Sequence, residues 1–99
     1  MKPEQRELKG TTEEFDRFIS ELKEAIHFAE GKHRLYPYDL IHGAGIMVEE
    51  AGETMQAAID ATYFDEDHDV MAVDYELLQT AAMCFRLWVS TWRITREEG

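Results

Sequence analysis

The sequence has few cysteines and basic residues and no long apolar run, and each shortage excludes a class of protein. A single cysteine, Cys84, excludes a disulfide within the chain and permits a reducing compartment. Its apolar neighbours predict a buried thiol. No apolar run approaches the roughly 20 residues of a transmembrane helix, and the polar start MKPEQRELKG has no signal-peptide core. We therefore expect a cytoplasmic protein that binds no membrane.

The charge balance is strongly acidic, with 21 acidic and 10 basic residues and a formal net charge of −11. Nucleic acids and membrane surfaces are themselves anionic, so this balance argues against binding to either. It suits a protein that binds cations, one that mimics nucleic acid, or one whose charge serves solubility alone. At 99 residues the chain is one domain, and it is short enough that association would help to complete its core.

Apolar residues recur at steps of three and four along most of the chain, which is the period of amphipathic helices. A polar tail at residues 1–10 precedes a single domain at 11–99, in which the pattern predicts three helices, near residues 12–30, 39–63 and 70–95. Thr11 and Glu14 have the form of a capping box, and Asp39 is placed to cap the second helix. Because no strand pattern occurs, we expect an all-α fold.

The apolar stripes of the last two helices predict how they pack. In the second helix the stripe expected to face inward is Leu40, Ile41, Ala44, Met47, Val48, Ala51, Met55, Ala58 and Ile59. Gly43, Gly45 and Gly52 lie inside this helix and indicate either close packing of another element against it or simply a weak stretch of helix. In the third helix a wide stripe extends to Trp88 and Trp92. We therefore predict an antiparallel hairpin plus an N-terminal helix, with a four-helix-bundle core completed in a homodimer or homotetramer.

Paired polar residues border the apolar stripes of the two hairpin helices. Glu50 and Glu53 are three positions apart and therefore share one face of the second helix. Glu76 and Gln79 have the same spacing on the third helix, and an antiparallel hairpin can place them opposite the first pair. Carboxylates this close repel one another unless a cation or a proton lies between them. Oxygen ligands of this kind suit Mg²⁺ or Mn²⁺.

Two segments that contain these acids, VEEAGETMQAAID and YELLQTAAMCFRLW, together resemble the MazG-like all-α nucleoside triphosphate pyrophosphohydrolases. The signature of that family is E-E-x-x-E on one helix and E-x-x-D on the next. Residues 49–53 match the first half in full, whereas Gln79 stands where the second half has Asp. The resemblance covers about residues 38–90. It implies Mg²⁺-dependent hydrolysis of a nucleoside triphosphate to the monophosphate and pyrophosphate, which would remove non-standard or excess nucleotides.

The resemblance also implies roles for individual residues. Glu50, Glu53 and Glu76 would be Mg²⁺ ligands, with Gln79 in the fourth position. A glutamine carbonyl can ligate Mg²⁺ or hold a water molecule, but it carries no charge, so we expect a lower metal affinity. The group that activates the attacking water would be Glu49 or Glu53.

Basic residues elsewhere are candidates for binding the substrate. Arg86 lies on about the same helical face as the second pair and is expected to reach phosphate. Lys32, His33 and Arg34 form a basic cluster in the connector between the first two helices, where they would cover the nucleotide as a flap. His42, before the first pair of acids, is a candidate contact to base or phosphate.

Three other interpretations fit parts of the sequence. The same fold with a weakened metal site would serve as an oligomeric nucleotide-binding or regulatory module, which Gln79 favours. An acidic mimic of DNA would spread its acids evenly over an outer face. The Glu24-x-x-His27 step occurs in di-iron helix bundles, which need a second such pair and two further glutamates.

Overall fold

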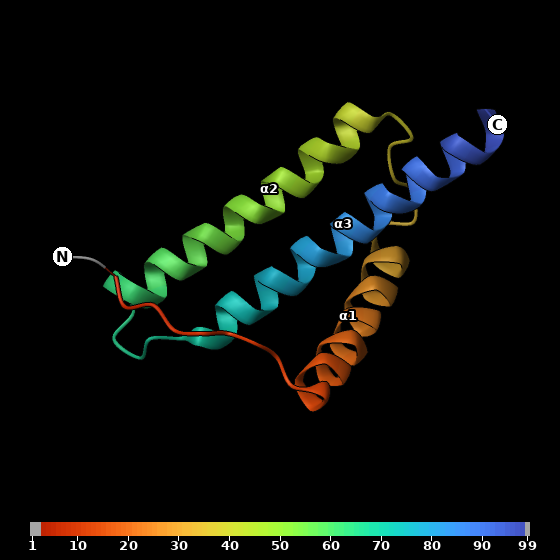
Figure 1. Ribbon diagram of the computed structural model, residues 1–99. Helices are drawn as coiled ribbons and strands as arrows, with labels where there is room; N and C mark the ends of the chain where they lie inside the picture. Colours follow the sequence, from red (N-terminus) through yellow and green to blue (C-terminus); the bar gives the residue numbers. More distant parts are fainter. Residues whose placement is uncertain (1–2, 99) are drawn as a thin grey trace.

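The computed structural model describes residues 3–98, and over that range the chain forms helices and no strand (Figure 1). The elements are α1 at Thr12–Lys32, α2 at Leu40–Ile59, the π-helical turn η1 at Asp60–Phe64, and α3 at Val70–Glu98. The prediction of an all-α fold with three helices is therefore confirmed. Residues 3–10 of the predicted tail have no regular structure. Residues 1–2 of that tail and residue 99 of the predicted domain lie outside the described residues.

Side chains next to the helix ends determine where α1 and α2 begin. The Thr11 hydroxyl accepts a hydrogen bond from the Glu14 amide at 3.1 Å, and the Glu14 carboxylate accepts one from the Thr11 amide at 2.9 Å. This is the predicted capping box. Asp39 accepts hydrogen bonds from the amides of Ile41 and His42 at the start of α2. Both caps satisfy amides that have no partner within their helix.

The helices form an antiparallel hairpin with a third helix packed beside it. In Figure 1, α2 and α3 run side by side in opposite directions, and α1 lies next to α3 at a steep angle to it. Within the described residues α1 packs against α3 rather than against α2. None of these helices combines the length and the apolar character needed to cross a bilayer.

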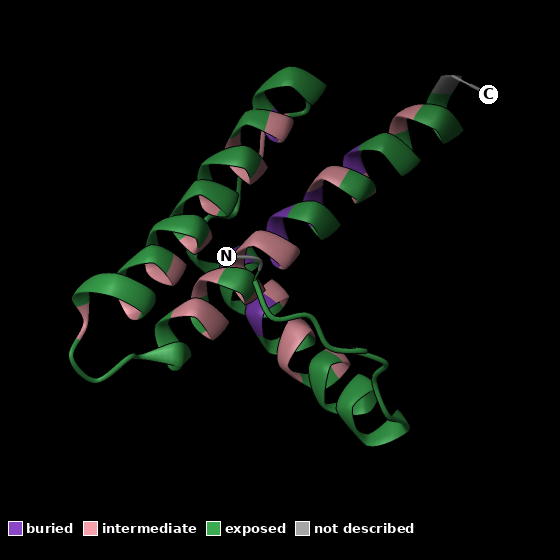
Figure 2. Ribbon diagram, turned by 60° about the vertical axis from the view of Figure 1, so that its left-hand side comes forward, coloured by how far each residue is buried: buried purple, intermediate pink, exposed green. Residues whose placement is uncertain are grey.

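The buried core of the chain is small. It consists of Ala25, Ala29, Ala82 and Met83, surrounded by the partly buried side chains of Ile26, Tyr36, Ile46, Met47 and Leu78. Most of these side chains are small or only partly covered, so a single chain removes little apolar surface from water. Figure 2 shows the buried positions of α3 along one side of that helix, with exposed residues on most of the remaining surface.

Of the three glycines in α2, Gly43 is the one that meets another element. A Cβ atom at Gly43 would lie 3.1 Å from both Leu87 Cδ1 and the Tyr36 hydroxyl, which itself donates a hydrogen bond to the Gly43 carbonyl at 2.9 Å. The predicted close packing is therefore found here. Nothing lies within 4 Å of a Cβ atom built at Gly45 or Gly52.

The predicted inward stripe of α2 is wrong for most of its members. Leu40, Ile41, Val48, Ala51, Met55 and Ile59 are exposed, and the side of α2 toward the rest of the chain carries Gly43, Ile46, Met47, Glu50 and Thr54. At about 100° per residue, Val48 lies on the opposite side of the helix from Glu50. Apolar residues occupy both sides of α2, and their period alone does not tell which side faces α3.

The prediction of a buried thiol is also wrong, because Cys84 is exposed. Its neighbours Ala82 and Met83 take the buried positions on α3, so that the next residue turns outward. Trp88 and Trp92 likewise lie outside the core and stack on each other with ring centroids 5.4 Å apart.

Candidate metal centre

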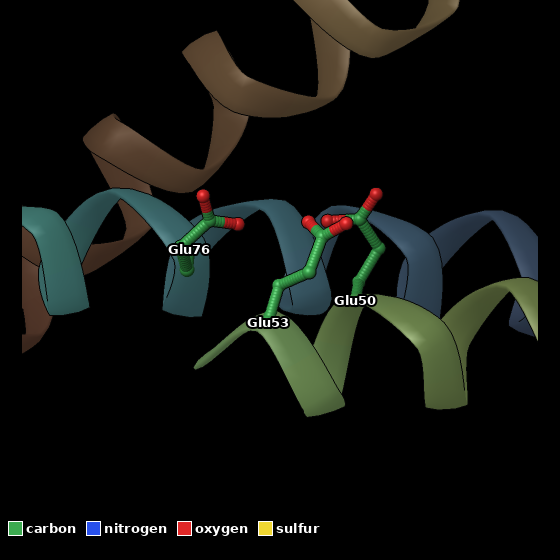
Figure 3. Close-up of side chains that lie close together, drawn as sticks. All are labelled: Glu50, Glu53 and Glu76. Carbon is green, nitrogen blue, oxygen red and sulfur yellow. The ribbon is translucent and has the colours of Figure 1, made fainter. Parts of the chain in front are cut away.

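Three carboxylates from the hairpin helices converge on one point. Glu50 and Glu53 project from α2 and Glu76 from α3, and one oxygen atom of each lies within 4.8 Å of the others. Figure 3 shows the three side chains pointing to the same side of the hairpin. Glu50 and Glu76 are half-buried and Glu53 is exposed. The structure thus brings together the three acids that the sequence pattern singled out as metal ligands.

The register between α2 and α3 is held close to these acids. The hydroxyl groups of Thr54 and Thr80 are 3.0 Å apart and share a hydrogen bond between the two helices. Each threonine lies four residues after one of the half-buried acids, Glu50 or Glu76, and is therefore about one turn from it. This polar contact places Glu76 across from the two acids of α2.

A cavity of about 480 Å³, which we call the acidic cavity, adjoins the three carboxylates. Glu50, Glu53, Glu76 and Gln79 line it from the hairpin. The opposite lining comes from α1 and the connector and includes Phe28, Lys32, His33 and Tyr36. The volume lies within the range of ligand-binding pockets, roughly 300 to 1,000 Å³. Acids and aromatic rings therefore line a single space of the size of a small-molecule site.

The proximity of the acids changes their proton affinity. Loss of hydration raises the pKa of Glu50, and the neighbouring carboxyl of Glu53 raises it further, with smaller contributions from Glu76 and Glu49. Loss of hydration and then Glu53 also raise the pKa of Glu76. Both effects disfavour the charged forms. A bound cation would act in the opposite direction, since it favours ionised ligands.

Arg86 is buried and is held by backbone carbonyls. The residue is 8% exposed, and its side chain donates hydrogen bonds to the carbonyls of Ala29 at 3.5 Å and His33 at 2.7 Å. Its guanidinium carbon lies 4.8 Å from the centre of the Tyr36 ring. The Ala29 carbonyl also accepts a hydrogen bond from the His33 amide at 2.9 Å. Because Arg86 lies on α3, its two hydrogen bonds tie the end of α1 to α3. Arg86 also lines the acidic cavity, and its contact with phosphate stays a prediction.

The other predicted substrate contacts are separated by the fold. Lys32 lines the acidic cavity, with its ammonium group 5.6 Å from the centre of the Phe28 ring. Arg34 lines a different cavity. His42 lines neither, and its ring nitrogen lies 2.7 Å from the Asp39 carboxylate at the start of α2. It precedes Glu50 by eight residues, about 12 Å along the helix axis.

Glu49, predicted as one of two candidates for activating water, does not line the acidic cavity. It is exposed, one residue before Glu50. A step of about 100° turns its side chain away from the face that carries the three convergent acids. Of the two candidates, the structure places Glu53 in the cavity.

Several residues of the site were missed by the sequence reasoning. Thr54 and Thr80 lie four residues after Glu50 and Glu76, and Tyr75 lies four residues before Gln79, so helical spacing alone was sufficient to nominate them. Phe28 gives no such signal, because its place in the cavity depends on how α1 crosses α3.

The arrangement also bears on the competing interpretations. Within residues 3–98, the group of acids and histidines close enough to share a metal ion is Glu50, Glu53 and Glu76, and neither Glu24 nor His27 belongs to it. Three acids gathered in one cavity also differ from the even outer spread that mimicry of DNA predicts.

The chain was also compared with known families, proteins and structures. No family model matches the chain, and no curated protein or solved structure is significantly similar to it. Membership of the MazG-like family therefore stays a prediction from the residues at 49–53 and 76–79.

Proposed function

We propose that the protein is a Mg²⁺-dependent nucleoside triphosphate pyrophosphohydrolase, which releases a nucleoside monophosphate and pyrophosphate and so removes non-standard or excess nucleotides. The observation that carries the proposal is the convergence of three carboxylate oxygens within 4.8 Å beside a cavity of about 480 Å³. A charged triphosphate next to three acids needs a cation between them, and the acids are the ligands that such a cation prefers.

The three acids would have to draw closer together to share one Mg²⁺ ion. In its octahedral shell neighbouring oxygens are about 2.9 Å apart and opposite oxygens about 4.2 Å, whereas the present group is bounded by 4.8 Å. Glu53 is exposed, so its side chain is free to rotate toward an ion. Mn²⁺ has the same preference for oxygen ligands. Gln79 lines the same cavity and offers a neutral oxygen as a further ligand.

In this proposal each residue has a separate task. Glu50, Glu53 and Glu76 hold the ion, which when bound neutralises phosphate charge and makes water a better nucleophile. Glu53, as the most accessible acid, also orients the water that attacks the α-phosphate. Lys32 supplies a positive charge for the outer phosphates, and the rings of Phe28 and Tyr75 offer apolar surface to the base.

The test is an assay of pyrophosphate release with Mg²⁺ and a panel of ribo- and deoxynucleoside triphosphates. We expect turnover of at least one of them, and a loss of about 100-fold or more in Glu53→Gln, because this change removes a ligand and the group that orients water. Glu66→Gln is the matched control, since Glu66 lies in the exposed loop before α3. Absence of pyrophosphate with every nucleotide, or an equal rate in Glu53→Gln, would contradict the proposal.

The second candidate function is that of a nucleotide-binding or regulatory module without turnover. Gln79 favours it, because the neutral residue leaves the cavity with one negative charge fewer than the E-x-x-D pattern would give. This candidate predicts Mg²⁺-dependent binding of a nucleotide in a titration, with no product formed. The assay above and the titration together separate the two candidates.

We also propose that two or more copies of the chain associate. The accessible surface is 8311 Å², whereas a compact monomer of 11.5 kDa exposes roughly 5,800 Å². The radius of gyration is 16.1 Å, compared with about 12.6 Å for a compact chain of this length. The extended tail at residues 3–10 accounts for part of the difference in area, which is roughly 2,500 Å² in all. A stable dimer buries roughly 800 Å² per partner.

The outer face of α2 is the surface that we assign to this association. A stripe of exposed apolar and glycine residues follows it at steps of three and four: Ile41, Gly45, Val48, Gly52, Met55 and Ile59. This is the spacing of a seam between two helices. The space next to Gly45 and Gly52 permits a second helix to approach closely. A second copy would contribute the same face, and the hairpins would form a four-helix core.

A further inference from the structure

A second cavity, of about 400 Å³, adjoins the acidic cavity and has the opposite charge. The two cavities share Leu35, Tyr36 and Arg86 in their linings. The second is also lined by Arg34 from the connector and Arg93 from α3. We call it the arginine cavity. The sequence pattern did not predict it, because Arg34 and Arg93 are far apart in the chain.

The concentration of positive charge in the arginine cavity is unusual for this chain. Three of the 10 basic residues of a protein with net charge −11 line one cavity, and Glu30 is the acid in its lining. The ion pairs found among the described residues involve Arg6, Arg17, His27 and His42. The three arginines of the cavity have no carboxylate partner of this kind in the described part of the chain, and their charge is therefore available to a ligand.

Part of this cavity is fixed in place before any ligand arrives. Arg86 is held in its orientation by the His33 carbonyl and by the Tyr36 ring. Two of its N–H groups donate to carbonyls, out of the five that a guanidinium carries. Ser90, also buried, donates a hydrogen bond to the Tyr38 carbonyl at 3.4 Å. A rigid donor lowers the entropy cost of binding. Arg34 and Arg93 are exposed and can move toward a ligand.

We propose that the arginine cavity binds a small phosphate-bearing anion without the help of a metal ion. Guanidinium groups match the oxygens of phosphate through paired hydrogen bonds. With three arginines and one glutamate in the lining, the cavity has a net charge of about +2, which favours a ligand with several negative charges. Its walls at Tyr36 and Pro37 also admit an apolar group. This site does not depend on the hydrolase activity proposed above.

The test is a calorimetric titration of the full chain with pyrophosphate in metal-free buffer. We expect one site per chain. Arg93→Gln and Arg34→Gln should each weaken binding by about tenfold or more, because each removes a charge-assisted hydrogen bond. Both side chains are exposed, so both variants should fold. Arg17→Gln is the control, since Arg17 lies on α1 in an exposed ion pair with Glu21, and it should leave binding unchanged.

Three results would overturn the proposal. They are the absence of saturable binding, an equal loss in Arg17→Gln, and tighter binding of a tricarboxylate than of pyrophosphate. A loss in Lys32→Gln with none in Arg93→Gln would place the anion in the acidic cavity instead, and would also overturn it. Because no metal ion is present, each of these results is independent of whether the protein hydrolyses nucleotides.

Discussion

The two faces of α2 reverse the arrangement expected of an amphipathic helix. The face toward α1 and α3 carries Glu50 and Glu53, and the outer face carries the exposed side chains of Ile41, Val48 and Met55. A helix of a water-soluble domain normally places its apolar stripe inward and its charges outward. Each face of α2 therefore needs something that a single chain without ligand does not provide.

The two needs differ in kind. Acids drawn together beside a cavity are costly to keep ionised, and a cation or a proton relieves that cost. Covering exposed apolar side chains with another surface would gain hydrophobic free energy of about 25 cal/mol per Å². The inner face thus points to a ligand and the outer face to a second copy of the chain.

The largest effect should come from placing a charge on the outer face. We expect Val48→Glu to weaken association by 100-fold or more, because an unpaired carboxylate would be buried between two helices. Sedimentation equilibrium at micromolar concentration measures this. Val70→Glu is the matched control, since Val70 is similarly exposed, at 68% compared with 62% for Val48, but lies at the start of α3. A wild-type chain that is monomeric at these concentrations would refute the interpretation of the outer face.

A smaller effect is expected from adding a charge to the inner face. Gln79→Asp should tighten Mg²⁺ binding by about tenfold, because Asp supplies a fourth carboxylate to the cavity and affinity rises with ligand charge. If the protein is a hydrolase, turnover at low Mg²⁺ should rise as well. The measurement is a Mg²⁺ titration followed by calorimetry.

Gln56→Asp controls for the general effect of charge in that titration. Gln56 is exposed on α2 and donates a hydrogen bond to Asp60 at 2.9 Å, and it does not line the acidic cavity. Equal changes in Mg²⁺ affinity for the two variants would show that Gln79 has no special place beside the metal ligands.

The difference between the faces also explains how much the sequence could predict. Local signals, such as the capping box at Thr11 and Glu14 and the cap at Asp39, depend on a few adjacent residues, and the structure contains both. The convergence of Glu50, Glu53 and Glu76 needed one further assumption, that of an antiparallel hairpin. The convergence of these acids was therefore predictable from their helical spacing together with the choice of an antiparallel hairpin.

Packing over longer distances was not predictable in the same way. Val48 was expected to face inward from helical period alone, and this expectation was wrong because it depends on which of two apolar sides of α2 meets α3. The burial of Arg86 was not foreseen, since it depends on where the carbonyls of Ala29 and His33 at the end of α1 lie. The way α1 packs against α3 depends on residues far apart in the chain, so no local pattern in a single sequence predicts it.

The inner face also predicts how stability depends on pH without metal. The pKa values of Glu50 and Glu76 are raised above the usual 4.5. Their contribution to stability is therefore fully present below the unfolded pKa and is lost as pH rises through the higher folded values. We expect the melting temperature of the metal-free protein to rise as the pH is lowered from neutral toward the unfolded pKa of 4.5. The rise should be smaller in Glu50→Gln.

Other acids act in a lower pH range and do not obscure this result. The pKa values of Glu14 and Asp39 are lowered by hydrogen bonds from backbone amides, so their contribution is lost only as pH falls below about 4.5. Glu66→Gln is a control for removal of a charge. An identical pH profile for Glu50→Gln and wild type would show that the convergent acids do not interact.

The smallest effects should come from replacing glycines of α2 with alanine. The same replacement tests the inner face at Gly43 and the outer face at Gly52. Gly43→Ala should destabilise the fold, because the new methyl group would lie 3.1 Å from Leu87 Cδ1 and from the Tyr36 hydroxyl. Gly52→Ala meets nothing within 4 Å, so it should stabilise the dissociated chain by up to about 1 kcal/mol through helix propensity. If a second copy packs there, the same methyl should weaken association several-fold. Thermal melts measure the effect on folding, and sedimentation over a range of concentrations measures the effect on association. If Gly52→Ala associates as tightly as wild type, Gly52 has no role in the contact between copies.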